Sequence, residues 1–170
     1  MTDLGTVTQV DDGWELRFER RLPHPVEKVW EAITDPDLLL TWWGKVEASD
    51  LRPGGRFVLA WQNEGGPTMT ATITAYDPPR LLETDGDVHG RIRWELEPDG
   101  DGTRLVFLNT LAEAPSGEHL GMQIGFPENL AGWHWHLAAL EASLDGHPWA
   151  ITDMTAWEGF RDRYAAASEA

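Results

Sequence analysis

The sequence predicts an α+β fold in which a mostly antiparallel sheet precedes one long helix. Two observations carry this prediction. Short segments with apolar residues at alternate positions follow one another through residues 46–111, and turn-forming Gly, Pro, Asn and Asp separate them. Residues 127–144 instead carry apolar residues at helical spacing. Because no repeat or linker-like stretch interrupts the 170 residues, one domain is expected to hold most of the chain.

The first elements are predicted to be one strand and two short helices. Residues 14–22 alternate large apolar side chains with Glu and Arg, which is typical of a half-buried strand. Pro25 is expected at the first position of the first helix. Asp35 and Pro36 repeat the chemistry of a helix start, and Gly44 is expected to end this second helix.

Six further strands bring the expected sheet to about six or seven strands. Turn sequences such as PGG, DPP and DGDG separate them. The predicted strands cover residues 46–51, 56–62, 68–76, 80–84, 91–97 and 103–111.

The long helix is expected to lie on the sheet through one apolar stripe. The stripe consists of Leu130, Trp133, Leu137, Leu140 and Leu144. A last helix is predicted at residues 155–167. We therefore divide the chain into a domain at residues 1–146 and a helical extension at residues 147–170, which packs on the domain or at a dimer interface.

Composition disfavours several classes of partner. Lys plus Arg number 13 and Asp plus Glu number 29, so the net charge is −16. A chain this acidic repels phosphate backbones and anionic lipids, so neither nucleic acid nor membrane is an expected partner. The absence of Cys fits a reducing compartment, and no apolar run is long enough to span a bilayer, so a cytoplasmic location is expected.

Motifs for metals, cofactors and nucleophiles are missing. His134 and His136 lie two apart on a helix and point in opposite directions, so they cannot ligate one ion. The DGDVHG run that contains His89 resembles the start of a calcium loop but lacks its final Glu, so a hairpin turn is the better interpretation. No phosphate-binding glycine motif or GxSxG serine is present, and no metal or cofactor is predicted.

Several segments resemble one known family. They are RRLPHPVEKVWEAITDPDLLLTWWG at residues 20–44, PGGRF at residues 53–57, DPPRL at residues 77–81 and GWHWHLAALEASLDG at residues 132–146. The chain resembles the START-like (SRPBCC) superfamily, in the branch named after the activator of the heat-shock-protein-90 ATPase. The resemblance implies a helix-grip fold, in which a curved antiparallel sheet wraps around the long helix and a cavity between them holds apolar small molecules in many relatives.

The leading hypothesis is that the chain binds a small, largely apolar ligand between sheet and long helix. His136 is the expected polar contact, because it lies at the edge of the apolar stripe. The expected lining comprises Trp43, Trp61, Met69, Trp94, Phe107, Trp133, His136, Leu137 and Leu140. The alternative that these large rings simply fill the core stays open.

Two further hypotheses come from other classes of protein. The acidic surface and the outward-pointing Trp135, Trp149 and Trp157 favour a co-chaperone-like interaction module or a homodimeric scaffold. A cyclase- or hydratase-type enzyme would use His136 as general base with an acid such as Glu95 or Asp87.

Overall fold

An antiparallel sheet of eight strands forms the base of the fold in the computed structural model, which describes residues 3–61, 68–87, 89–119, 121–150 and 153–169. Its strands are β1 (Thr6–Val10), β2 (Gly13–Leu22), β3 (Gly44–Ser49), β4 (Arg56–Trp61), β5 (Thr68–Asp77), β6 (Leu81–Gly86), β7 (Gly90–Asp99) and β8 (Gly102–Leu111). They lie in the order β1-β2-β8-β7-β6-β5-β4-β3, so β2 pairs with β1 on one side and with β8, the last long strand of the chain, on the other. A separate short hairpin pairs β9 (Glu118–His119) with β10 (Met122–Gln123).

The sheet has one strand more than the upper end of the predicted count. The missed strand, β1, pairs with β2 across the turn at Asp11 and Asp12. Its five residues, TVTQV, include only two large apolar side chains, and most of the strand is exposed at the sheet edge. Burial therefore imposes little apolar alternation on β1, and the pattern that revealed the other strands is absent there.

Two short helices follow β2 as predicted, with small differences at their ends. The first helix, α1 (Val26–Thr34), begins one residue later than expected, so Pro25 is its N-cap rather than its first residue. In the second, α2 (Pro36–Trp42), Asp35 Oδ1 accepts from the backbone N–H of Asp37 at 2.9 Å. Gly44 does not end this helix but begins β3, where a Cβ would lie 2.5 Å from the carbonyl oxygen of Ala60.

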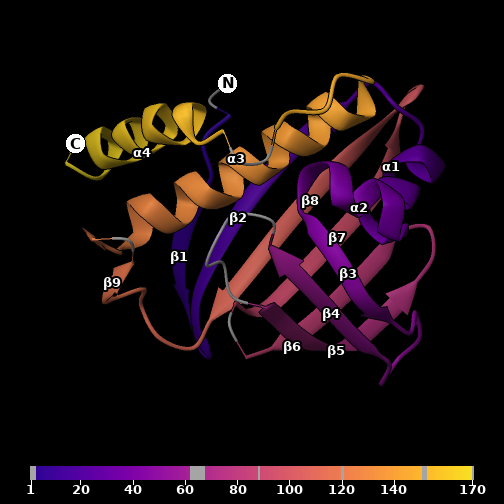
Figure 1. Cartoon of the computed structure of the whole chain (residues 1–170), viewed down its shortest axis with the longest axis horizontal. Coiled ribbons are helices and arrows are strands. Elements are labelled where there is room, and N and C mark those ends of the chain that lie inside the picture. Colours follow the sequence, from indigo (N-terminus) through magenta and orange to yellow (C-terminus); the bar gives the residue numbers. More distant parts are fainter. Residues whose placement is uncertain (1–2, 62–67, 88, 120, 151–152, 170) are drawn as a thin grey trace.

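The long helix α3 (Phe126–Leu144) crosses one face of the sheet, and the C-terminal helix α4 (Thr155–Ser168) lies against α3 on its other side (Figure 1). The five residues of the predicted stripe on α3 are all buried. Gly132 of α3 faces α4, because a Cβ there would be in ordinary contact with Trp157 Nε1 at 4.0 Å. The structure thus confirms the α+β helix-grip fold.

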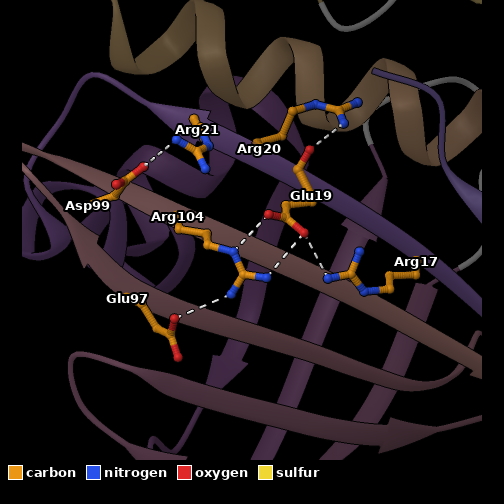
Figure 2. A network of polar contacts seen from close by, with 7 residues as sticks. All are labelled: Arg17, Glu19, Arg20, Arg21, Glu97, Asp99 and Arg104. Atoms are coloured by element: carbon orange, nitrogen blue, oxygen red, sulfur yellow. Dashed lines mark hydrogen bonds and ion pairs between the residues drawn. The ribbon is translucent and has the colours of Figure 1, made fainter. Parts of the chain in front are cut away.

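The outer face of the sheet is charged and internally paired. Glu19 of β2 accepts from Arg104 Nε of β8 at 2.7 Å and from Arg17 Nη2 at 2.8 Å, and Arg104 also reaches Glu97 of β7 (Figure 2). These two guanidinium groups lower the pKa of Glu19 to about 2. The other side of the same strands carries the apolar residues that face α3.

Candidate functional site

Aromatic rings from the sheet and α3 meet around Phe107, in the middle of β8. Phe107 lies opposite Trp94 of β7 and Phe18 of β2 in the strand register. Its ring centroid is 4.6 Å from that of Trp94 and 4.6 Å from that of Trp133 on α3. Alternation along the strands places all these rings on the α3 side, where they form a continuous aromatic core.

Trp43 enters this core from the end of α2. Its neighbour Trp42 is anchored, because Trp42 Nε1 donates to the carbonyl oxygen of Ala32 at 2.9 Å. The Trp43 ring lies 5.9 Å from Trp133 and 6.5 Å from Trp61, measured between centroids. Trp43 is 3 % exposed, yet its Nε1 has no hydrogen-bond partner among the described residues. A buried donor left unpaired costs about 1–3 kcal/mol, so this N–H has hydrogen-bonding capacity that no described side chain or carbonyl uses.

Asn109 is a polar residue inside the core that the sequence analysis did not identify. Its Nδ2 donates to the carbonyl oxygens of His89 and Arg91 at 2.5 and 3.1 Å. Its Oδ1 accepts from Trp133 Nε1 at 2.9 Å. Asn109 therefore fixes both the start of β7 and the orientation of the Trp133 ring.

A signal for Asn109 was present in the sequence. On β8, Leu105, Phe107 and Asn109 occupy alternate positions, so Asn109 belongs to the buried face by its spacing alone. A polar residue at an inward position requires internal partners. That reasoning would have placed Asn109 near the site.

His136 lies on the α2 side of α3 with one ring nitrogen engaged. Its Nδ1 is 3.2 Å from the carbonyl oxygen of Trp42. Because a carbonyl only accepts, Nδ1 carries the proton and the neutral ring presents Nε2 as an acceptor. Burial lowers the pKa of His136 to about 4, so the ring is neutral near pH 7. His136 nevertheless keeps part of its surface accessible.

His89 is the second functional candidate that sequence reasoning missed, because it was assigned to a turn. Its ring lies between Trp61 and Trp133, with centroid distances of 4.8 and 5.6 Å. Burial lowers the pKa of His89 to about 4, although Asp87 acts to raise it. Like His136 and Trp61, His89 is half-buried rather than fully enclosed. These three side chains mark the accessible end of the aromatic core.

The structure brings the predicted lining residues into one core. Six of them are linked by ring contacts: Trp43, Trp61, Trp94, Phe107, Trp133 and His136. Met69, Leu137 and Leu140 are at most 1 % exposed and belong to the same core. Whether these residues contact a ligand stays a prediction, and their packing shows that much of the core is filled by their own side chains.

The acids suggested as partners of His136 lie elsewhere. Glu95 accepts from Arg93 Nε at 2.6 Å on the outer face of the sheet. Asp87 Oδ1 accepts from the backbone N–H of Thr70 at 3.3 Å. The described group near His136 is His89 rather than a carboxylate. A proton on His89 would oppose protonation of His136, which lowers the pKa of His136 further.

The opposite side of α3 holds a different cluster, formed with α4 and the N-terminal segment. Tyr164 Oη accepts from the backbone N–H of Gly5 at 2.7 Å and lies 2.8 Å from His134 Nδ1. His134 Nε2 lies 3.4 Å from Asp3 Oδ2, and the His134 ring stacks on Phe160 at 4.0 Å. Burial lowers the pKa of His134 to about 4.

The expectation that Trp135 and Trp157 point outward as a contact surface is wrong. Trp135 is 2 % and Trp157 9 % exposed, because the chain's own C-terminal helix covers this side of α3. Trp149 remains 37 % exposed, with its ring centroid 6.4 Å from that of Trp135. The interaction-module hypothesis loses two of the three rings that motivated it.

In the described ranges, no three His, Asp or Glu side chains come together in a way that could hold a metal ion. No helix in that part of the chain is long and apolar enough to cross a membrane.

Comparison with known proteins begins with a family model. Residues 23–145 match the model for "Activator of Hsp90 ATPase homolog 1-like protein". This range begins just before α1 and ends at the end of α3. No curated protein matches the chain.

Several solved structures share the fold. CalU16 from Micromonospora echinospora is 24 % identical, with a TM-score of 0.70 over 98 % of this chain and 96 % of its own. A conserved protein of unknown function from Enterococcus faecalis is 18 % identical, with a TM-score of 0.69 over 97 % of this chain and 90 % of its own. DynU16, from the dynemicin biosynthetic locus, is 23 % identical, with a TM-score of 0.62 over 82 % of this chain and 49 % of its own.

Proposed function

The chain belongs to the activator of Hsp90 ATPase homolog 1-like protein family, and from that premise we propose that it binds a small, largely apolar molecule between the sheet and α3. The observation that carries the proposal is the contrast inside the aromatic core. Most of its rings are fully buried, whereas Trp61, His89 and His136 keep accessible surface. Aromatic walls with a few polar groups are typical of small-molecule sites.

Two hydrogen-bonding groups without a described partner support the same proposal. Trp43 Nε1 is a buried donor to which the described residues offer no acceptor. His136 Nε2 is an acceptor with no partner among the described residues. Asn109 and Trp133, in contrast, satisfy each other inside the same core.

Native mass spectrometry of the freshly purified protein is the first test, with the same sample measured again after denaturation. A mass excess that disappears on denaturation reveals a bound molecule and its mass. The same spectrum counts the chains in the assembly, which tests the homodimer hypothesis.

A titration with the neutral fluorescent probe N-phenyl-1-naphthylamine tests the location. Trp61→Ala should weaken probe binding about tenfold or more, because the ring that it removes would bury part of the probe. Trp149→Ala is the matched control, since Trp149 is 37 % exposed and does not belong to the hydrophobic core. If the probe does not bind, or if both variants weaken it equally, the proposed site is wrong.

A further inference from the structure

His136 at the accessible end of the core and Trp43 deeper inside it carry unpaired hydrogen-bonding groups of opposite kinds. His136 Nδ1 is committed as a donor to the Trp42 carbonyl, so His136 can offer a ligand only the lone pair of Nε2. Trp43 Nε1 can only donate, and it has no acceptor within the described part of the chain. A ligand group that both donates and accepts matches this pair, as a hydroxyl does.

The same region lacks a positive charge that would hold an anion. Burial keeps His136 and His89 neutral near pH 7. Among the described residues, no Lys or Arg charge acts on the pKa of either histidine, although Arg20 and Arg163 do act on His134 across the helix. A carboxylate placed beside His136 would therefore lose its hydration without gaining a cationic partner.

The surrounding walls favour a flat ring over a flexible chain. The Trp43 ring lies edge-to-face with Trp61 at 6.5 Å and with Trp133 at 5.9 Å, measured between centroids. His89 adds a fourth ring between Trp61 and Trp133. Aromatic ligands gain edge-to-face and offset contacts in such surroundings beyond the burial of their area.

We propose that the ligand is an uncharged aromatic hydroxyl compound whose O–H donates to His136 Nε2 while its ring lies against Trp61 and Trp133. An oxygen of the same ligand accepts from Trp43 Nε1 once the ring enters the core. This inference rests on the proposed function and adds the chemical class of the ligand. Fatty acids and other carboxylates are the compounds that it excludes.

Three matched probes test the class by isothermal titration calorimetry at pH 7.5. They are 2-naphthol, 2-methoxynaphthalene, which lacks the donor, and 2-naphthoate, which is an anion. We expect 2-naphthol to bind about tenfold more tightly than either of the others, as one net hydrogen bond would give. His136→Leu should remove that advantage and leave 2-methoxynaphthalene binding unchanged. His147→Leu, at an exposed position, should change neither.

The outcomes separate this inference from the proposed function. If 2-methoxynaphthalene or 2-naphthoate binds as tightly as 2-naphthol, the hydroxyl assignment is overturned while the apolar site stands. If none of the three binds and the neutral fluorescent probe also fails, the proposed function itself is overturned. Should His136→Leu not fold, the wild-type ¹⁵N shift of His136 Nε2 decides the question. It should move on addition of 2-naphthol and stay in place with 2-methoxynaphthalene.

Discussion

Two histidines on opposite sides of α3 have the same depressed pKa and different surroundings. His134 faces α4 and the N-terminal segment, where Tyr164 Oη lies 2.8 Å from its Nδ1 and Asp3 lies 3.4 Å from its Nε2. His136 faces the accessible end of the aromatic core, where only its Nδ1 has a described partner. In both cases burial lowers the pKa to about 4.

This difference teaches that a perturbed pKa does not by itself identify a site. Desolvation acts on both rings, because both lie inside the chain. What distinguishes them is the completeness of the hydrogen bonding. His134 uses both ring nitrogens to join three segments of the chain, so its role is structural, whereas His136 retains an acceptor for something else.

The largest expected effect is a loss of stability on acidification, to which both sides of α3 contribute. The pKa values of His89, His134 and His136 are lowered from 6.5 to about 4, so the unfolded chain binds more protons between these values. Stability is therefore full above pH 6.5 and falls as the pH drops toward 4. Between pH 7 and 5 the loss should be about 2 kcal/mol per histidine. Glu141, whose pKa is raised by burial, acts in the opposite direction.

Urea unfolding at a series of pH values measures this loss. His134→Leu and His136→Leu should each reduce the slope of stability against pH by the contribution of one histidine. If one variant leaves the slope of unfolding free energy against pH unchanged, the histidine that it replaces is not held neutral in the folded chain. That result would contradict the lowered pKa described for that histidine.

Truncation of Trp133 should cost about 3–5 kcal/mol of unfolding free energy, as for other large buried rings. Trp133→Ala removes the ring contact with Phe107 and leaves Asn109 Oδ1 without its donor. Trp149→Ala should cost less than about 1 kcal/mol because its ring is partly exposed. Equal losses in chemical denaturation would contradict the role given to Trp133 in the aromatic core.

The structural role of the His134 side is tested by removing one oxygen. Tyr164→Phe deletes the hydroxyl that lies between Gly5 and His134, which should cost about 1–3 kcal/mol. Tyr76→Phe is the matched control, because Tyr76 is only partly buried and packs its ring against Trp30. Thermal unfolding should separate the two variants, and an unchanged midpoint for Tyr164→Phe would make the cluster dispensable.

The smallest effect is expected on the outer face of the sheet. Glu19→Gln should cost less than about 1 kcal/mol at pH 7, because the pair with Arg104 is partly exposed and screened. The pKa of Glu19 is lowered to about 2, so its contribution is full above pH 4.5 and is lost as the pH falls toward 2. Glu27→Gln, at an exposed position of α1, serves as control. A larger loss for Glu19→Gln that added salt does not reduce would contradict a surface role.

The fold could be predicted from sequence wherever burial imposes a pattern. Residues 127–144 carry an apolar stripe because one side of α3 rests on the sheet, and the observed helix begins only one residue earlier. β1 escaped prediction because an exposed edge strand needs no apolar alternation. The family resemblance, expected over about residues 14–146, is confirmed by the family match over residues 23–145 and by the shared fold.

The candidate site could be predicted only in part. Periodicity places Phe107, Trp94 and Trp133 on inward faces, and the structure brings them together. Periodicity cannot show that the His89 ring lies between two tryptophans, because its position depends on the path of the turn that precedes β7. Nor can it show which nitrogen of His136 is engaged, because the Trp42 carbonyl comes from a helix 94 residues away in sequence.

The most direct test of the central claim is a long-range ¹H–¹⁵N spectrum of the histidine rings at pH 7. The account predicts two neutral rings in opposite tautomers, with the proton of His136 on Nδ1 and that of His134 on Nε2. On addition of 2-naphthol, the Nε2 signal of His136 should shift and the signals of His134 should not. A protonated His136, the same tautomer at both positions, or equal shifts at both would contradict the account.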